Sequence, residues 1–102
     1  MPNCGLTSDV LTAINEILIK YPVVDRAVVF GSRAKNTHHA YSDIDIALFG
    51  AVRGNTVACV ACELDALPTA YTFDVTAYSA IKHEALRAHI DRVGVLIYES
   101  GI

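Results

Sequence analysis

Asp43-Ile44-Asp45-Ile46-Ala47-Leu48-Phe49 alternates acidic or small residues with large apolar ones, and Gly50 closes the run. Alternation with a period of two is typical of a half-buried β-strand. Residues two apart on a strand point to the same side, about 6–7 Å apart along it, so Asp43 and Asp45 share one face. The isoleucines that alternate with them face the other way. The stretch therefore predicts a strand with an apolar core side and two carboxylates toward an opening.

A second predicted strand precedes this one and ends in a glycine. The chain is rich in valine from Val23 to Phe30, as expected of a largely buried strand, and then reaches Gly31-Ser32. A glycine at the end of a strand lets backbone N–H groups approach a phosphate closely, and a following helix start adds a favourable dipole. Ser32 can also donate its hydroxyl. We therefore expect a phosphate-binding turn at Gly31 and Ser32.

A third carboxylate lies on a third predicted strand, residues 71–76. Asp74 alternates with Phe73 and Val75 and has a threonine two positions away on each side, which places it on a polar face. Carboxylates gathered on one face repel each other unless a cation lies between them, and Mg²⁺ favours oxygen ligands of this kind. Asp43, Asp45 and Asp74 thus predict a magnesium site. Two ions about 3.5–4 Å apart would suit in-line transfer of a nucleotidyl group.

The remaining elements alternate between helix and strand. The first predicted helix is capped by Thr7 or Ser8 and ends at Tyr21-Pro22, and the second is opened by Asn55 or Thr56 and ends at Pro68. A last helix is capped by Ser79, and its inner stripe consists of Leu86, Ile90 and Val93. A turn at Gly94 and a strand at Val95–Tyr98 follow it. This order predicts an α/β fold with helices packed on one sheet of about four strands, parallel or mixed. At 102 residues we expect one domain, residues 1–102.

Composition narrows the class of protein. A net charge of -3 argues against direct nucleic-acid binding, which normally needs a basic surface. No apolar run of about 18 residues and no signal-peptide pattern is present, so we expect a cytoplasmic protein without a membrane span. The hydrophobic fraction of 53% exceeds the usual figure of about 45–50%, which suggests that a partner covers some apolar surface.

For several residues, an interpretation without a catalytic role must also be considered. A lone Asp-x-Asp often indicates only the solvent-exposed face of an edge strand. The combination with Gly31-Ser32 and Asp74 is what favours a site for a nucleotide and a metal. Cys59-Val60-Ala61-Cys62 has the spacing of a redox or zinc pair but lies within a predicted helix without a second ligand pair, which favours packing in the core or at a subunit interface. His38 and His39 lie between the two halves of the motif, where they could touch substrate or pyrophosphate, but we favour solvent exposure. For His83 and His89 we expect surface positions or contact with a partner, and for Tyr71, Tyr78 and Tyr98 core edges or interfaces.

One motif of the chain resembles the signature of the DNA polymerase β nucleotidyltransferase superfamily. It consists of Gly31-Ser32, a spacer of ten residues and Asp43-Ile44-Asp45. The flanking runs 30–34 and 41–47 most resemble the minimal nucleotidyltransferase (MNT) branch, whose members are encoded beside HEPN-domain proteins as antitoxins. The similarity spans the whole chain and includes its ending, residues 89–98. The resemblance implies the small nucleotidyltransferase fold, with a mixed sheet.

It further implies a magnesium-dependent enzyme that uses ATP to add AMP to a HEPN toxin, usually on a tyrosine, and so silences that toxin within a hetero-oligomer. By position, Gly31 and Ser32 would bind the triphosphate and Arg33 would contact phosphate. Asp43 and Asp45 would hold metal, and Asp74 would complete the site as a ligand and possible base.

Two alternatives remain open on the sequence. The chain could be a nucleotide-binding subunit that neutralises its partner by contact while its catalytic residues are idle. It could also transfer a nucleotide to a small molecule such as an aminoglycoside. The short chain, without an acidic accessory domain, argues against the second alternative.

Overall fold

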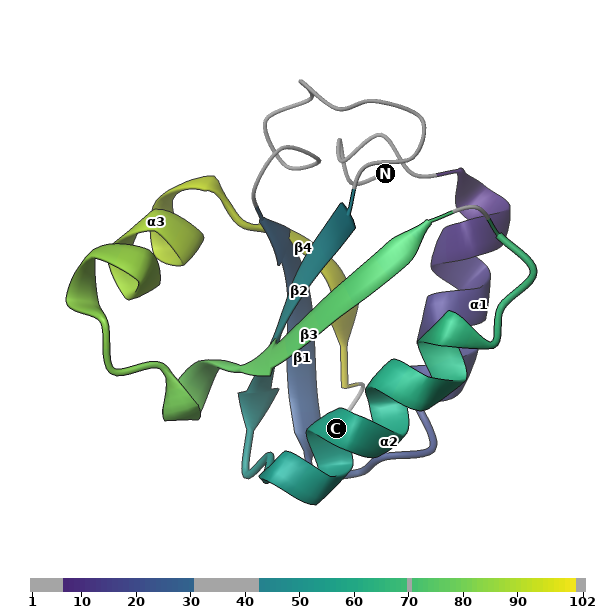
Figure 1. Cartoon of the computed structure of the whole chain (residues 1–102), viewed down its shortest axis with the longest axis horizontal. Coiled ribbons are helices and arrows are strands. Elements are labelled where there is room, and N and C mark those ends of the chain that lie inside the picture. Colours follow the sequence, from purple (N-terminus) through teal and green to yellow (C-terminus); the bar gives the residue numbers. More distant parts are fainter. Residues whose placement is uncertain (1–6, 31–42, 70, 101–102) are drawn as a thin grey trace.

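A mixed β-sheet forms the centre of the computed structural model, which describes residues 7–30, 43–69 and 71–100 (Figure 1). The strands are β1 (Val24–Phe30), β2 (Asp43–Gly50), β3 (Thr72–Ala77) and β4 (Val95–Glu99), in the order β3-β2-β1-β4. β1 pairs antiparallel with β2 and β4, whereas β2 pairs in parallel with β3. The mixed sheet confirms the predicted fold class and settles the strand order, which the sequence left open.

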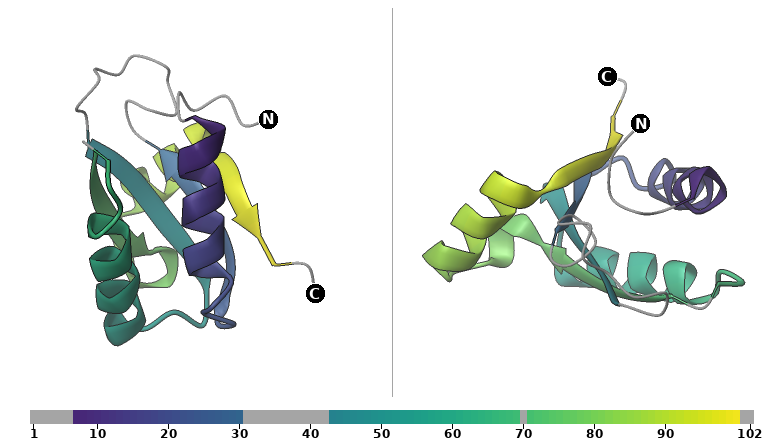
Figure 2. Two further views of the ribbon diagram at one scale, coloured as in Figure 1. Left: turned by 90° about the vertical axis from the view of Figure 1, so that its right-hand side faces the viewer. Right: turned by 90° about the horizontal axis from the view of Figure 1, so that it is seen from above.

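Helices lie on both faces of this sheet. α1 (Ser8–Leu18) and α2 (Gly54–Asp65) cover one face, and α3 (Glu84–Val93) lies on the other side, as the view from above shows (Figure 2). α2 links the parallel strands β2 and β3, which need a crossover connection of this kind. A short 3₁₀ turn, η1 (Tyr78–Ala80), separates β3 from α3. Among the described residues, no helix has the length and apolar character needed to span a membrane.

The core lies between the sheet and the pair α1 and α2. On β2, Ile44, Ile46 and Leu48 are fully buried, whereas Asp45 between them is only half-buried on the opposite face. β3 repeats the pattern, with Phe73 buried and its neighbour Asp74 exposed. The alternation read from the sequence therefore sets which face of each strand enters the core. The same cluster includes Leu11, Ile14, Leu18, Val24, Ala27, Val29, Val60, Leu64, Ala77 and Ile97.

The first helix begins where the sequence predicted and ends early. The Thr7 hydroxyl caps it by accepting a hydrogen bond from the N–H three residues later, at 3.3 Å. The helix ends at Leu18 rather than at Tyr21-Pro22, because the N–H of Tyr21 donates to the Leu18 carbonyl only three residues back. Proline disfavours the helical conformation in the residue before it, which explains the tightened end.

The predicted opening of the second helix was wrong by one or two residues. α2 begins at Gly54, with Arg53 at the cap position and no side-chain capping hydrogen bond. Asn55 already lies in the first turn, and its side-chain oxygen accepts from the N–H of Thr56 at 2.9 Å. The helix ends at Asp65, ahead of Pro68, as proline in the chain requires.

The predicted start of the last helix at Ser79 was also wrong. Ser79 lies in η1, and α3 starts at Glu84 with the His83 side chain as its cap, accepting from the N–H of Leu86 at 3.2 Å. Leu86 is 37% exposed and so does not belong to the inner stripe, whereas Ile90 is 2% exposed. The interruption has a tertiary cause, since η1 is held against β2 by an aromatic contact described below.

Gly50 closes β2 for a steric reason. Its φ of +124° lies in the region that side chains rarely adopt, and a Cβ atom there would sit 2.2 Å from the backbone oxygen of Val23. The turn from β2 toward α2 therefore depends on the absence of a side chain at this position.

Candidate active site

Two of the predicted site residues lie side by side on neighbouring strands. Asp45 of β2 and Asp74 of β3 are Cα partners in the parallel register. Neighbouring strands are about 4.7–4.9 Å apart, and partnered residues point to the same face. That face is the one turned away from α1 and α2, because the residues on either side of each aspartate along its strand point toward the core. The structure thus brings together two carboxylates that are 29 positions apart in the sequence.

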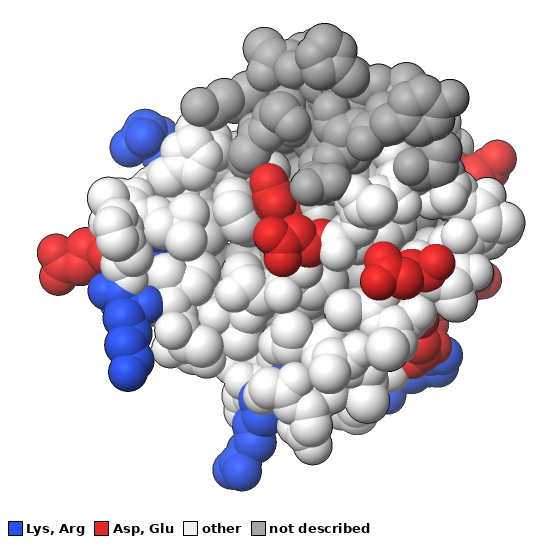
Figure 3. All heavy atoms as spheres, viewed as in Figure 1, with Lys and Arg blue, Asp and Glu red and all other residues white. Residues whose placement is uncertain are grey.

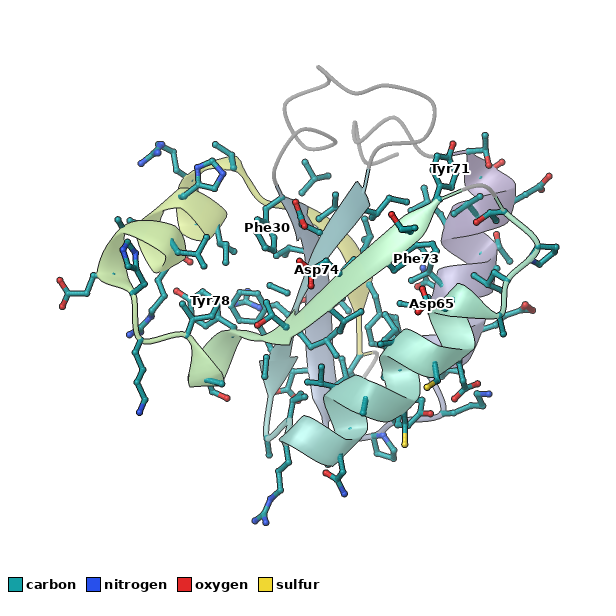
Figure 4. The ribbon with its side chains drawn as sticks, in the orientation of Figure 1. Phe30, Asp65, Tyr71, Phe73, Asp74 and Tyr78 are labelled. Atoms are coloured by element: carbon teal, nitrogen blue, oxygen red, sulfur yellow. The ribbon has the colours of Figure 1, made fainter. Side chains whose placement is uncertain are left out.

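Asp74 is the more accessible of the two. It is exposed and lies on β3, which is an edge strand of the sheet. Figure 4 shows Asp74 on the side of β3 toward Phe30 and Tyr78, with Phe73 and Asp65 on the α2 side. Among the described residues, no hydrogen bond or ion pair engages Asp74. Its carboxylate is therefore open to a ligand or an incoming group.

The chain leaves β1 next to these carboxylates. Phe30, the last residue of β1, is the Cα partner of Asp45, so Asp45 has Asp74 on one side and the end of β1 on the other. Gly31, Ser32 and Arg33 follow Phe30 directly in the sequence but lie outside the described residues, as do His38 and His39. Their predicted roles remain predictions.

Asp43 is placed only through its backbone. It is the first residue of β2, two positions before Asp45, and its Cα partner is Thr72. The strand predicted from the alternation is confirmed, but the Asp43 side chain is outside the described part. Among the described side chains, no three His, Cys, Asp or Glu residues form a group that could hold a metal ion.

Electrostatics favours a cation between the two described carboxylates. Asp45 and Asp74 are direct partners on β2 and β3, and like charges at such positions repel each other. Water weakens this repulsion, because Asp74 is exposed. Hard divalent cations bind such oxygen donors and commonly keep water and substrate phosphates as their other ligands. Figure 3 shows acidic side chains gathered beside the residues drawn in grey, with Lys and Arg side chains at the margins of this view. The donor set fits a metal that is shared with a phosphate-containing substrate.

An aromatic cluster forms the other end of the same face. The rings of Phe49 on β2 and Tyr78 in η1 stack at 4.2 Å, and the Arg26 guanidinium lies 4.4 Å from the Phe49 ring centre. The Tyr78 hydroxyl donates to the Asp91 carboxylate of α3, with oxygen–oxygen distances of 2.9 and 3.0 Å. These contacts join α3 to the sheet. Sequence reasoning treated Tyr78 only as a core edge or interface residue and missed this cluster.

The other residues singled out in the sequence belong neither to the pair of carboxylates nor to the aromatic cluster. Cys59 and Cys62 are on α2 as predicted, but both are exposed, so packing in the core is wrong for them. His83 is exposed and His89 is half-buried, both on or next to α3. Tyr71 and Tyr98 are half-buried and pack against the core, as expected of core edges.

Comparisons with known proteins agree with this architecture. Residues 12–101 match the family model of polymerase beta nucleotidyltransferases. No curated protein matches the chain significantly. A toxin–antitoxin complex solved with AMP-PNP is similar with a TM-score of 0.73 and 23% identity, over 89% of this chain and 74% of that chain.

Two further solved structures are similar. The toxin–antitoxin MntA-HepT gives a TM-score of 0.68 and 19% identity, over 92% of this chain and 74% of that chain. The tri-AMPylated Shewanella oneidensis HEPN toxin in complex with MNT antitoxin gives 0.69 and 19%, over 93% and 74%. These likenesses concern the fold, and the family model covers nearly the whole chain. The protein therefore belongs to the polymerase beta nucleotidyltransferase family.

Proposed function

We propose that this chain is a protein adenylyltransferase that moves AMP from ATP onto a tyrosine of a HEPN toxin and so acts as the antitoxin of a toxin–antitoxin pair. The observation that carries the proposal is the direct pairing of Asp45 and Asp74, beside the end of β1 that leads into Gly31-Ser32. Membership of the nucleotidyltransferase family supports the reaction type.

The partner and acceptor are proposed by analogy with the solved relatives. Those relatives are toxin–antitoxin complexes, one solved with AMP-PNP and one whose HEPN toxin is tri-AMPylated. An exposed carboxylate on an edge strand suits an acceptor that belongs to another protein chain, because the acceptor can approach from outside the sheet. We further propose that residues 1–102 form one domain, working in the cytoplasm within a hetero-oligomer and without direct contact to nucleic acid.

Mg²⁺ would be held by Asp43, Asp45 and Asp74, and two ions would take part in the reaction. When bound, magnesium supplies positive charge that offsets the charge of the triphosphate and of the reacting oxygens. Gly31 and Ser32 would bind the triphosphate through backbone N–H groups and the serine hydroxyl, and Arg33 would add a charged contact. These residues would orient the α-phosphate in line with the acceptor.

Asp74 would also serve as the general base. Its carboxylate would take the proton of the tyrosine hydroxyl as the new bond forms between that oxygen and the α-phosphorus of ATP. The bond from the α-phosphorus to the bridging oxygen breaks, and pyrophosphate leaves. A positioned base of this type contributes about 10²–10⁴-fold to a rate.

The test is transfer of label from α-labelled ATP to the co-purified partner in the presence of Mg²⁺. The wild-type chain is compared with the Asp43→Asn/Asp45→Asn double variant and with Asp65→Asn. Asp65 is a matched control because it is an exposed aspartate on α2, on the opposite side of the sheet. We expect label on the partner with wild type and Asp65→Asn, and none with the double variant.

The same experiment separates the proposal from its rivals. A stable complex that binds ATP but gives no label in any lane would identify an idle subunit that neutralises by contact. Unchanged silencing of the partner by the double variant would lead to the same conclusion. Transfer to an added aminoglycoside, without transfer to the partner, would identify a small-molecule enzyme.

A further inference from the structure

An exposed pair of thiols lies on α2, away from the candidate active site. Cys59 and Cys62 are separated by three positions on the helix, and both are exposed. Side chains three apart on a helix are neighbours, with Cβ atoms about 5–6 Å apart. The buried residues of the same helix, Val60 and Leu64, face the core instead. Neither packing in the core nor the proposed AMP transfer accounts for the two cysteines.

The pair borders a hollow on the surface. A hollow of about 340 Å³ is lined by Tyr21, Ala58, Cys59, Cys62 and Glu63. The Glu63 carboxylate accepts hydrogen bonds from the Lys20 ammonium and from the Tyr21 hydroxyl, so it is held toward the end of α1. The two cysteines are the groups of this hollow that remain available to a ligand.

Both cysteines line this hollow together with Tyr21, so the two thiols border the same surface feature. The hydrogen bond that Tyr21 donates to Glu63 is the main cause that raises the pKa of Tyr21 to about 12.

Helix geometry favours a shared ligand over a disulfide. A disulfide needs Cβ atoms about 3.5–4.5 Å apart, closer than the roughly 5–6 Å that a regular helix gives at this spacing. Two thiolates that bind one tetrahedral metal ion at about 2.3 Å each place their sulfur atoms about 3.8 Å apart, well beyond the roughly 2 Å of a disulfide bond. Such a chelate fits the spacing with less distortion of α2.

We propose that Cys59 and Cys62 form a dithiol site that chelates one thiophilic metal ion, such as Zn²⁺ or Cd²⁺, per chain. Each thiol loses its proton on binding, so up to two protons are released for each ion bound. In the part of the chain that the structure describes, no third His, Cys, Asp or Glu residue joins the pair. Solvent molecules would fill the other ligand positions.

Titration of the full chain with Cd²⁺, in a buffer with a non-chelating reductant, tests the proposal. Binding is followed by the sulfur-to-cadmium charge-transfer absorption and by equilibrium dialysis. Cys4→Ser is the matched control, because it removes the third cysteine and leaves the pair intact. We expect wild type and Cys4→Ser to bind one ion per chain with equal affinity.

Cys59→Ser and Cys62→Ser should each bind at least about 10–100-fold more weakly, since even residues behind the ligands contribute that much to metal affinity. Cys59→Ala and Cys62→Ala serve as second variants, and circular dichroism checks the fold of each. Equal affinity in Cys59→Ser and Cys4→Ser would overturn the site. Loss of binding in Cys4→Ser, or one ion for every two chains in a dimer, would overturn it as well.

Discussion

On the face of the sheet covered by α1 and α2, every strand contributes buried apolar side chains, whereas the face toward α3 carries Asp45, Asp74 and the stacked rings of Phe49 and Tyr78. The two faces are built from the same strands, since alternate residues of each strand go to opposite sides. One face supplies the free energy of folding, and the other can then hold two carboxylates side by side. The comparison predicts that neighbouring residues of one strand have separable effects on activity and stability.

The largest effect is expected from Asp74→Asn on the site face. The asparagine cannot take a proton from the acceptor, so we expect AMP transfer to fall by about 10²–10⁴-fold. Because Asp74 is exposed and without a described hydrogen bond or ion pair, the free energy of unfolding should change little. Initial rates of label transfer, together with urea unfolding, measure both quantities. Full activity in this variant would remove Asp74 from the proposed chemistry.

Ile46→Ala tests the opposite face one residue after Asp45. Ile46 is fully buried in the core, and truncation of such a side chain costs about 2–5 kcal/mol. Urea denaturation should show this loss, while the fraction that remains folded should still transfer AMP. If the folded fraction were inactive and the stability unchanged, the assignment of the two faces would be wrong.

Gly50→Ala tests the turn that ends β2. The added Cβ atom would meet the Val23 backbone oxygen, and the positive φ is strained for any side chain, so we expect a loss of about 1–3 kcal/mol. Gly54→Ala is the matched control, because a Cβ atom at Gly54 meets nothing within 4 Å. Thermal unfolding of the two variants distinguishes steric strain from a general effect of replacing glycine. Equal melting temperatures would contradict the steric reason.

Tyr78→Phe tests how α3 is attached to the site face. The variant keeps the ring stacked on Phe49 but loses the hydrogen bonds to Asp91, which should cost about 0.5–1.5 kcal/mol. Tyr98→Phe is the control, because Tyr98 packs against the core and no hydrogen bond of its hydroxyl is described. Hydrogen exchange of α3 amides should increase in Tyr78→Phe and not in Tyr98→Phe.

The smallest effect is expected from the contact between the end of α1 and α2. Hydrogen bonds from Lys20 and Tyr21 lower the pKa of Glu63. The stabilisation is therefore present above the ordinary pKa of glutamate, 4.5, and is lost as pH falls through the lowered value. The pKa of Tyr21 is raised to about 12 from its ordinary value of 10.0. Its contribution to the stability of the fold is therefore fully present below pH 10 and is lost as the pH rises through about 12.

Glu63→Gln should therefore be slightly less stable than wild type near neutral pH and approach it in acid. Exposed ion pairs contribute little, so the difference will be small. Urea unfolding at several pH values from 3 to 7 measures it. A difference between the two proteins that stays constant across this range would show that Glu63 contributes through packing and not through its charge.

Local patterns in the sequence were enough to predict most of the elements that carry the site. The alternation in residues 43–49 gave β2, its buried isoleucines and the face of Asp45, because side-chain direction in a strand follows from backbone geometry alone. The fold class and the likeness to nucleotidyltransferases followed from the order of elements and from the Gly-Ser and Asp-x-Asp spacing. Helix boundaries were less well predicted, since Ser79 and Asn55 are acceptable caps that the chain does not use.

The sequence by itself determined which residues share a strand face, because a period of two is a local property of the chain. Only the tertiary structure decided that Asp74 lies beside Asp45. The register of β2 and β3 depends on how α2, which connects the two strands, packs on the sheet. It also decided that η1 stacks on Phe49 and that Cys59 and Cys62 face outward. These outcomes depend on contacts between segments far apart in the chain, which no local pattern encodes.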